Sequence, residues 1–78
     1  MKVNVKYFGQ VAEAAGKTEE KLELEKGASL KEFKLKQIKQ YQIPDPDSVQ
    51  IAVNQDLVDD KELTEGDEIA FLPPFAGG

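Results

Sequence analysis

The feature that most constrains how this chain folds is the alternation of apolar and polar residues at its start. Val3, Val5 and Tyr7 take every second position of residues 2–8, and the alternate positions are polar except for Phe8. A period of two predicts a half-buried strand, because successive side chains point to opposite faces. With 78 residues, the chain has room for one domain with a single small core. We therefore expect a sheet that this first strand helps to build.

Two helices are expected between the strands. Gln10 to Ala15 is rich in helix formers and is followed by Gly16, a residue that can take the left-handed conformation that ends a helix. Ser29 and Glu32 form a capping-box pattern, which predicts a main helix beginning at Leu30. This helix should end before Pro44. The inward stripe expected from helical spacing is Leu30, Phe33, Ile38 and Tyr41.

Lys34 falls inside that stripe, and the sequence leaves two interpretations of it open. Either the lysine stem lies over the core while its charge reaches water, or the helix is rotated from the expected orientation.

Further strands are predicted by alternation in residues 18–25, 49–53 and 69–72, with a short one at Leu57–Val58. The crossing from Asp59 to Glu65 should be irregular and acidic. This order of elements predicts an α+β fold in which a mixed sheet packs on one main helix. We expect a domain of residues 1–72 followed by an extended tail of residues 73–78.

Composition excludes several kinds of chemistry. The chain has no Cys or His, so it offers no disulfide, zinc knuckle, thiolate nucleophile or imidazole base. A net charge of −5 disfavours nucleic acid. No metal site is expected, because the acids of the loops (Asp59, Asp60 and residues 65–68) read as solvated or turn-forming charge. The alternating start favours neither a signal peptide nor a membrane span, so we expect a cytoplasmic protein.

The end of the chain is its most informative part. The last ten residues, IAFLPPFAGG, carry no charged side chain, although the preceding body is rich in charge. A frayed terminus is one interpretation. The other is that a partner takes up the tail: Pro73 and Pro74 stiffen its base, Phe75 anchors it, and Ala76 and the glycines pass through a narrow channel.

The chain resembles the small subunits of molybdopterin synthase, which are ubiquitin-like β-grasp sulfur carriers. Three stretches carry the resemblance along essentially the whole chain: KYFGQVAEAAG, IAVNQDLV and LTEGDEIAFLPPFAGG. In this family an ATP-dependent adenylating enzyme activates the C-terminal glycine, and a sulfur donor then replaces AMP to leave a thiocarboxylate. The sulfur is delivered to cyclic pyranopterin monophosphate inside the large synthase subunit.

The resemblance implies roles for particular residues and partners. Gly78 would carry the sulfur, and Gly77 would let the tail thread into the large subunit, in an assembly of two small and two large subunits. The active site would lie on that subunit, and ATP and the sulfur donor would be used by the activating partner, because the chain has no Gly-rich phosphate loop and is expected to bind no cofactor itself. Phe75 and Ala76 depart from the family, which more often has Val followed by Ser or Thr. Lys34 and Gln37 are also more polar than is usual there.

A docking surface is expected around the exit of the tail. Alternation places Phe8 and Leu72 on the sheet face away from the main helix, at the ends of two strands that are neighbours in a β-grasp sheet. Leu57 matches a third contact position of the family. Single exposed apolar residues are also ordinary on protein surfaces.

Two other functions stay open from the sequence. The chain could carry sulfur for another product, such as thiamine thiazole or thiolated tRNA, although thiamine carriers usually lack the YFGQVAEAAG segment. It could also be a ubiquitin-like modifier joined to protein lysines, or a simple interaction domain.

Overall fold

The computed structural model describes residues 1–73. Within them the chain forms five strands, two α-helices and one 3-10 turn. Their bounds are β1 (Lys2–Tyr7), α1 (Gly9–Ala15), β2 (Glu19–Glu23), α2 (Leu30–Tyr41), η1 (Pro46–Ser48), β3 (Gln50–Val53), β4 (Asp56–Leu57) and β5 (Glu68–Leu72). Pro74, Phe75, Ala76, Gly77 and Gly78 lie outside the described residues, so the expectations placed on them are not addressed by this structure.

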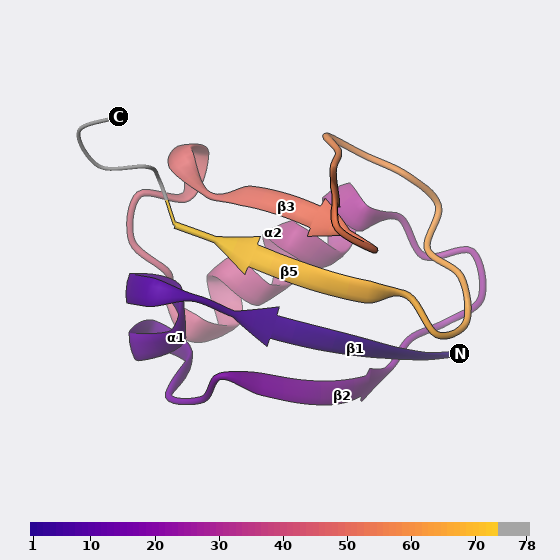
Figure 1. Ribbon diagram of the computed structural model, residues 1–78, viewed down its shortest axis with the longest axis horizontal. Coiled ribbons are helices and arrows are strands. Elements are labelled where there is room, and N and C mark those ends of the chain that lie inside the picture. Colours follow the sequence, from indigo (N-terminus) through magenta and orange to yellow (C-terminus); the bar gives the residue numbers. More distant parts are fainter. Residues whose placement is uncertain (74–78) are drawn as a thin grey trace.

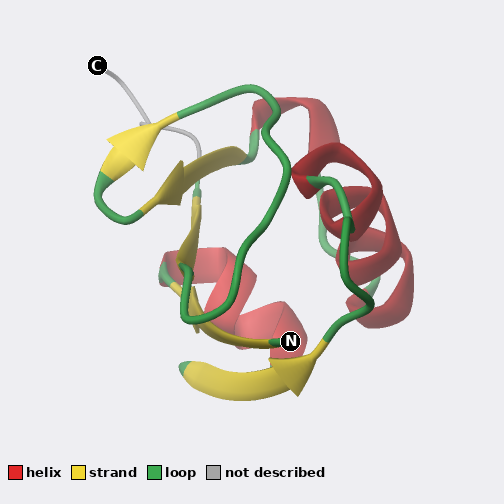
Figure 2. Ribbon diagram, turned by 90° about the vertical axis from the view of Figure 1, so that its right-hand side faces the viewer, coloured by secondary structure: helices red, strands yellow, loops and turns green. Residues whose placement is uncertain are grey.

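The strands form one mixed sheet in the order β2-β1-β5-β3-β4. β1 and β5 pair in parallel at its centre, and the other neighbours pair antiparallel. Figure 1 shows α2 crossing behind the sheet, and Figure 2 shows it from the side as a second layer. The expected α+β class, with a mixed sheet on one main helix, is confirmed. The parallel central pair matters for the site, because β1 and β5 end at the same edge of the sheet.

The core confirms the alternation on which the fold was predicted. Val3, Val5 and Tyr7 are buried beneath the sheet, and so are Ile69 and Phe71 of β5. Phe71 lies opposite Tyr7 in the register of the parallel pair. Leu30 and Phe33 of α2 pack against these strands, together with the remaining buried apolar residues Val11, Ile43, Val49, Ile51, Val53 and Leu63.

α2 begins where the capping pattern predicted. The backbone N–H of Glu32 donates to Ser29 Oγ at 3.2 Å, which satisfies one of the N–H groups that a helix start leaves unpaired. The helix ends at Tyr41, and Gln42 follows in the left-handed conformation with φ of 52°. α1 likewise ends before Gly16, at φ of 74°, as expected.

The inward stripe of α2 differs from the predicted one at Gln37. This glutamine is 2% exposed and stands in the core together with Leu30 and Phe33, whereas Ile38 and Tyr41 are only partly buried. Helical spacing alone placed apolar residues inward and could not anticipate that a polar side chain would find a buried partner there.

The structure decides between the two interpretations of Lys34. Its Nζ donates to the carbonyl oxygen of Val49 at 2.8 Å, and the side chain is partly buried. The stem therefore lies along the core while the charge binds a backbone oxygen at the start of β3. Leu35, beside it, is 61% exposed, so the helix is not rotated to bring the leucine inward.

The acidic crossing from residue 59 to residue 65 is irregular, as expected, apart from an isolated bridge between Ser29 and Glu62. Within residues 1–73, neither helix combines the length and the apolar composition needed to cross a membrane.

Candidate functional site

The candidate site is the edge of the sheet where β5 leads into the C-terminal tail. β1 and β5 run in parallel and end side by side there. The last rung between them is a hydrogen bond of 3.2 Å from the Phe8 N–H to the Phe71 carbonyl oxygen. Phe8 and Leu72 therefore follow paired residues and lie next to each other, on the face that the alternation predicted.

A close contact sets the path of the chain as it leaves the sheet. Gly9 follows Phe8 with φ of +56°, a conformation that favours glycine. An added Cβ at Gly9 would lie 3.0 Å from Pro73 Cγ. The proline ring therefore packs directly against the start of α1. Sequence patterns drew attention to Pro73 but not to Gly9, because this contact joins residues far apart in the chain.

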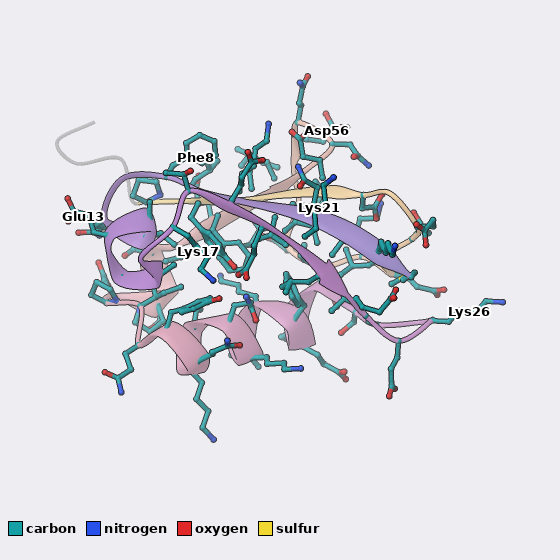
Figure 3. The ribbon with its side chains drawn as sticks, turned by 90° about the horizontal axis from the view of Figure 1, so that it is seen from below. Phe8, Glu13, Lys17, Lys21, Lys26 and Asp56 are labelled. Carbon is teal, nitrogen blue, oxygen red and sulfur yellow. The ribbon has the colours of Figure 1, made fainter. Side chains whose placement is uncertain are left out.

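We define the docking face as Phe8, Leu57 and Leu72. Phe8 is 44% exposed and Leu57 is 61% exposed, whereas Leu72 is partly buried. Figure 3 shows Phe8 on the side of the sheet opposite α2. Leu57 lies opposite Ala52, which in turn lies opposite Ala70, and Ala70 points away from the helix. Phe8, Leu57 and Leu72 therefore share one face, although β3 separates Leu57 from β5. That they bind a partner stays a prediction.

The surroundings of the docking face are mixed in polarity. Lys6 and Glu68, on neighbouring strands, form an ion pair of 3.6 Å beside Ala70. A groove of about 440 Å³ adjoins Leu57 and is also lined by Lys34 and Asp59. An apolar centre with charged neighbours is the arrangement common in protein interfaces.

A polar cluster that the sequence did not reveal lies on the other side of this edge. Glu20 Oε2 accepts hydrogen bonds from the hydroxyls of Tyr7 at 2.5 Å and Tyr41 at 2.7 Å. Gln37 Nε2 donates to the Tyr7 hydroxyl at 2.8 Å, and Lys17 Nζ lies 3.3 Å from Glu20 Oε1. Figure 3 shows Lys17 on the helix side of the sheet. The sequence marked Gln37 only as more polar than is usual in the family, and the expected inward stripe did not include it; its burial requires a partner for the amide.

The cluster shifts the pKa values of its members. Burial, followed by the hydrogen bond to the Glu20 carboxylate, raises the pKa of Tyr7 far above its ordinary value. Partial burial by itself would raise the pKa of Glu20, but hydrogen bonds from Tyr7, Tyr41 and Lys17 outweigh it and hold that pKa below its ordinary value. At neutral pH Glu20 is therefore an ionised carboxylate and the Tyr7 hydroxyl keeps its proton.

Asp67 forms a second cluster, near the start of β1. Its carboxylate accepts from the Thr64 N–H at 2.8 Å and from Asn54 Nδ2 at 2.9 Å, and Lys61 Nζ lies 3.5 Å away. These contacts outweigh the effect of burial and hold the pKa of Asp67 below its ordinary value. The turn chemistry expected of Asp67 is confirmed, and its oxygens are occupied by donors from the protein.

With this geometry in place, comparisons with known proteins identify the family. A model described as the ThiS family matches residues 5–78. The chain belongs to the ThiS family. Two curated relatives extend the match to the whole chain. The molybdopterin synthase sulfur carrier subunit of Chlamydomonas reinhardtii is 39% identical over 85 residues, covering 100% of both chains. The subunit of the same name from Mycobacterium tuberculosis is 39% identical over 86 residues, covering 100% of this chain and 99% of its own.

Several solved structures have folds similar to that of this member of the ThiS family. A putative molybdopterin converting factor, subunit 1, from Pyrococcus furiosus has a TM-score of 0.80 at 35% identity, covering 95% of this chain and 98% of its own. Subunit 1 of a complex with subunit 2 of the Helicobacter pylori molybdopterin-converting factor has a TM-score of 0.65 at 26% identity, with 100% of both chains covered. Small archaeal modifier protein 1 of Methanosarcina acetivorans has a TM-score of 0.74 at 26% identity, covering 99% and 96%. The expected ubiquitin-like β-grasp fold and the family resemblance are both confirmed.

Proposed function

We propose that this member of the ThiS family is the sulfur carrier subunit of a molybdopterin synthase. The observation that carries the proposal is similarity along the whole chain to two relatives that bear this name. The sequence also carries Gly77 and Gly78 in the tail, after β5 and residues 73–76. Location in the cytoplasm belongs to this proposal.

The proposed chemistry takes place on the C-terminal carboxylate of Gly78. A carboxylate is a poor electrophile because its oxygen is a poor leaving group. An adenylating partner therefore uses ATP to form an acyl-adenylate, and a sulfur donor replaces AMP to give a thiocarboxylate. This chain supplies the carboxylate and the path to it, and neither ATP nor the sulfur donor binds to the carrier itself. The sulfur then passes to cyclic pyranopterin monophosphate.

The second proposed partner is the large synthase subunit, in an assembly of two small and two large subunits. A related subunit 1 has been solved in complex with its subunit 2, which supports a partner of this kind. The docking face of Phe8, Leu57 and Leu72 would contact that subunit, and Pro73 would direct residues 74–78, including Phe75, Ala76 and Gly77, into it. An exposed apolar surface beside the exit of the tail suits both tasks.

The mass of the intact protein tests the chemistry. Incubation with the adenylating enzyme, ATP and a sulfur donor should raise the mass by the difference between sulfur and oxygen. Omitting ATP should abolish the change, and so should deletion of Gly78. A mass change that persists without Gly78 would contradict the assignment of that residue. Formation of molybdopterin by the loaded carrier with the large subunit then identifies the product, and thiolated tRNA or a thiamine precursor would identify another pathway.

A second candidate function is protein modification. Similarity to small archaeal modifier protein 1 at 26% identity over nearly the whole chain favours it. A modifier would become joined through Gly78 to lysine side chains of other proteins. Conjugates heavier than the carrier, sensitive to deletion of Gly78 but formed without thiocarboxylate, would support this function over sulfur transfer.

A further inference from the structure

The charge of Glu20 determines which groups donate and which accept in the cluster around it. An ionised carboxylate only accepts, so Tyr7 and Tyr41 must both donate to it. The Tyr7 hydroxyl is then free to accept, and Gln37 donates to it. Tyr7 is 2% exposed, so in the folded chain its hydroxyl depends on Glu20 and Gln37 for its hydrogen bonds.

Tyr7 connects this cluster to the candidate site. It is the last residue of β1 and lies opposite Phe71, and the two ring centroids are 5.5 Å apart. Its own N–H donates to the Thr18 carbonyl at 2.8 Å, and the next N–H, of Phe8, donates to Phe71. Phe71 is followed directly by Leu72. The side chain that Glu20 holds therefore belongs to the strand end from which the docking face and the tail continue.

Close packing of aromatic rings couples the position of Tyr7 to that of Phe71. The Tyr7 ring also meets Tyr41 edge-on at 5.8 Å, and Phe71 meets Phe33 edge-on at 6.0 Å. Rings packed in this way cannot shift singly, because the core has little empty space into which one of them could move. A displaced Tyr7 hydroxyl therefore displaces Phe71 and the backbone rung between β1 and β5.

We propose that Glu20 is a positioning residue for docking. Through Tyr7, its carboxylate holds the ends of β1 and β5, and with them Phe8, Leu72 and Pro73, in the arrangement that a partner binds. The inference deepens the proposed function, on which it rests only for the identity of the partner. The alternative is that Glu20 stabilises the whole domain without a local effect.

Acid should act on this cluster through Glu20 alone, and only below the ordinary carboxylate range, because the pKa of Glu20 is lowered. The carboxylate contacts Tyr7 from β1, Tyr41 from α2 and Lys17 from the segment before β2. Gln37 of α2 joins the cluster through the Tyr7 hydroxyl. Lysine and tyrosine titrate in the alkaline range, and glutamine does not titrate. Protonation of Glu20 removes the charge that both hydroxyls bind.

Hydrogen exchange tests the local claim. The reporters are the Tyr7 and Phe8 amides, and the reference is the Asn54 amide, which donates to the Glu68 carbonyl at 2.8 Å at the other end of β5. In Glu20→Ala, exchange at the reporters should accelerate about tenfold or more relative to the reference, because hydrogen bonds to a charged group are lost. Equal acceleration at all three amides would overturn the proposal.

Two further variants sharpen the result. Glu20→Gln keeps an oxygen that can accept from the tyrosines but carries no charge, so exchange at Phe8 should lie between that of the parent and that of Glu20→Ala and should not respond to acid. Asp67→Asn removes a comparable buried carboxylate near the start of β1 and should accelerate Asn54 more than Phe8. Reporters that respond equally to Glu20→Ala and Asp67→Asn would also overturn the local role.

Binding to the large synthase subunit tests the consequence. Glu20→Ala should bind about tenfold more weakly at neutral pH, and Glu20→Gln, which keeps an acceptor without the charge, should bind more tightly than Glu20→Ala and more weakly than the parent. Faster exchange at Phe8 without weaker binding would overturn the positioning role. Failure of the parent chain to bind that subunit would instead contradict the proposed function, and the exchange measurements would still decide whether Glu20 holds the strand ends.

Discussion

At the scale of single residues, Leu57 and Leu35 show why exposure by itself does not define a site. Both side chains are 61% exposed. Leu57 shares a sheet face with Phe8 and Leu72, although β3 lies between it and β5. Leu35 lies on the solvent side of α2, on a helix rich in lysine. The context of the two leucines, and not their hydrophobicity, is the reason that docking is predicted at Leu57 and not at Leu35.

We expect Leu57→Asp to weaken binding of the large synthase subunit by about tenfold, because a buried carboxylate in an apolar contact is left without a partner. Leu35→Asp is the matched control, with the same chemistry at the same exposure, and should bind like the parent chain. Isothermal titration calorimetry measures both, and circular dichroism checks that both variants fold. Equal binding by the two variants would remove Leu57 from the docking face.

At the scale of elements, α2 combines a start set locally with a face set by its neighbours. The Ser29 hydroxyl begins the helix through a bond within the same short segment. The inward face depends on distant residues: Gln37 is buried because Tyr7 of β1 accepts from it, and Lys34 is partly buried because Val49 offers a carbonyl oxygen. A helix boundary can therefore be read from spacing, whereas a polar core position requires its partner to be known.

Ser29→Ala should lower the free energy of unfolding by about 1 kcal/mol, the usual cost of losing an N-cap side chain. Urea unfolding followed by circular dichroism measures this change. Ser48→Ala is the control, because Ser48 lies in η1 and caps no α-helix. A loss no greater in Ser29→Ala than in Ser48→Ala would show that the cap adds nothing to stability.

At the scale of the whole molecule, two residues whose carboxylates have lowered pKa values form hydrogen bonds at opposite ends of β1. Glu20 binds Tyr7 near its end, and Asp67 lies near its start, where the Asn4 N–H donates to the Asp67 carbonyl at 2.9 Å. Each carboxylate releases its proton more readily in the folded chain than in the unfolded chain. As the pH falls, the unfolded state takes up these protons first, so acid favours unfolding.

The stability contributed by both groups should be complete above the ordinary carboxylate pKa of about 4 and should be lost as the pH falls through the lower folded values. Urea unfolding at neutral pH and at about pH 3 measures the loss. Asp67→Asn should be less stable than the parent at neutral pH and should lose less stability between the two conditions. An unchanged loss in the variant would show that Asp67 does not contribute to acid sensitivity.

The sequence by itself determined the elements whose causes are local. Alternation of apolar residues predicted β1 and β5, and the Ser29 cap predicted where α2 begins, because a period or a capping pattern is written in residues close together in the chain. The chemistry of the tail stays a prediction, which the motif ending in Gly78 carries through its resemblance to the family. Phe8 and Leu72 could be placed on one face by the same alternation.

The tertiary structure alone decided which distant groups meet. Parallel pairing of β1 with β5 brought Phe8 beside Leu72 and Gly9 against Pro73. The bond from Tyr7 to Glu20 and the contact of Gln37 with Tyr7 also join separate elements. Such contacts depend on register and on the crossing of α2 over the sheet, and no local pattern encodes either, because both result from packing one shared core.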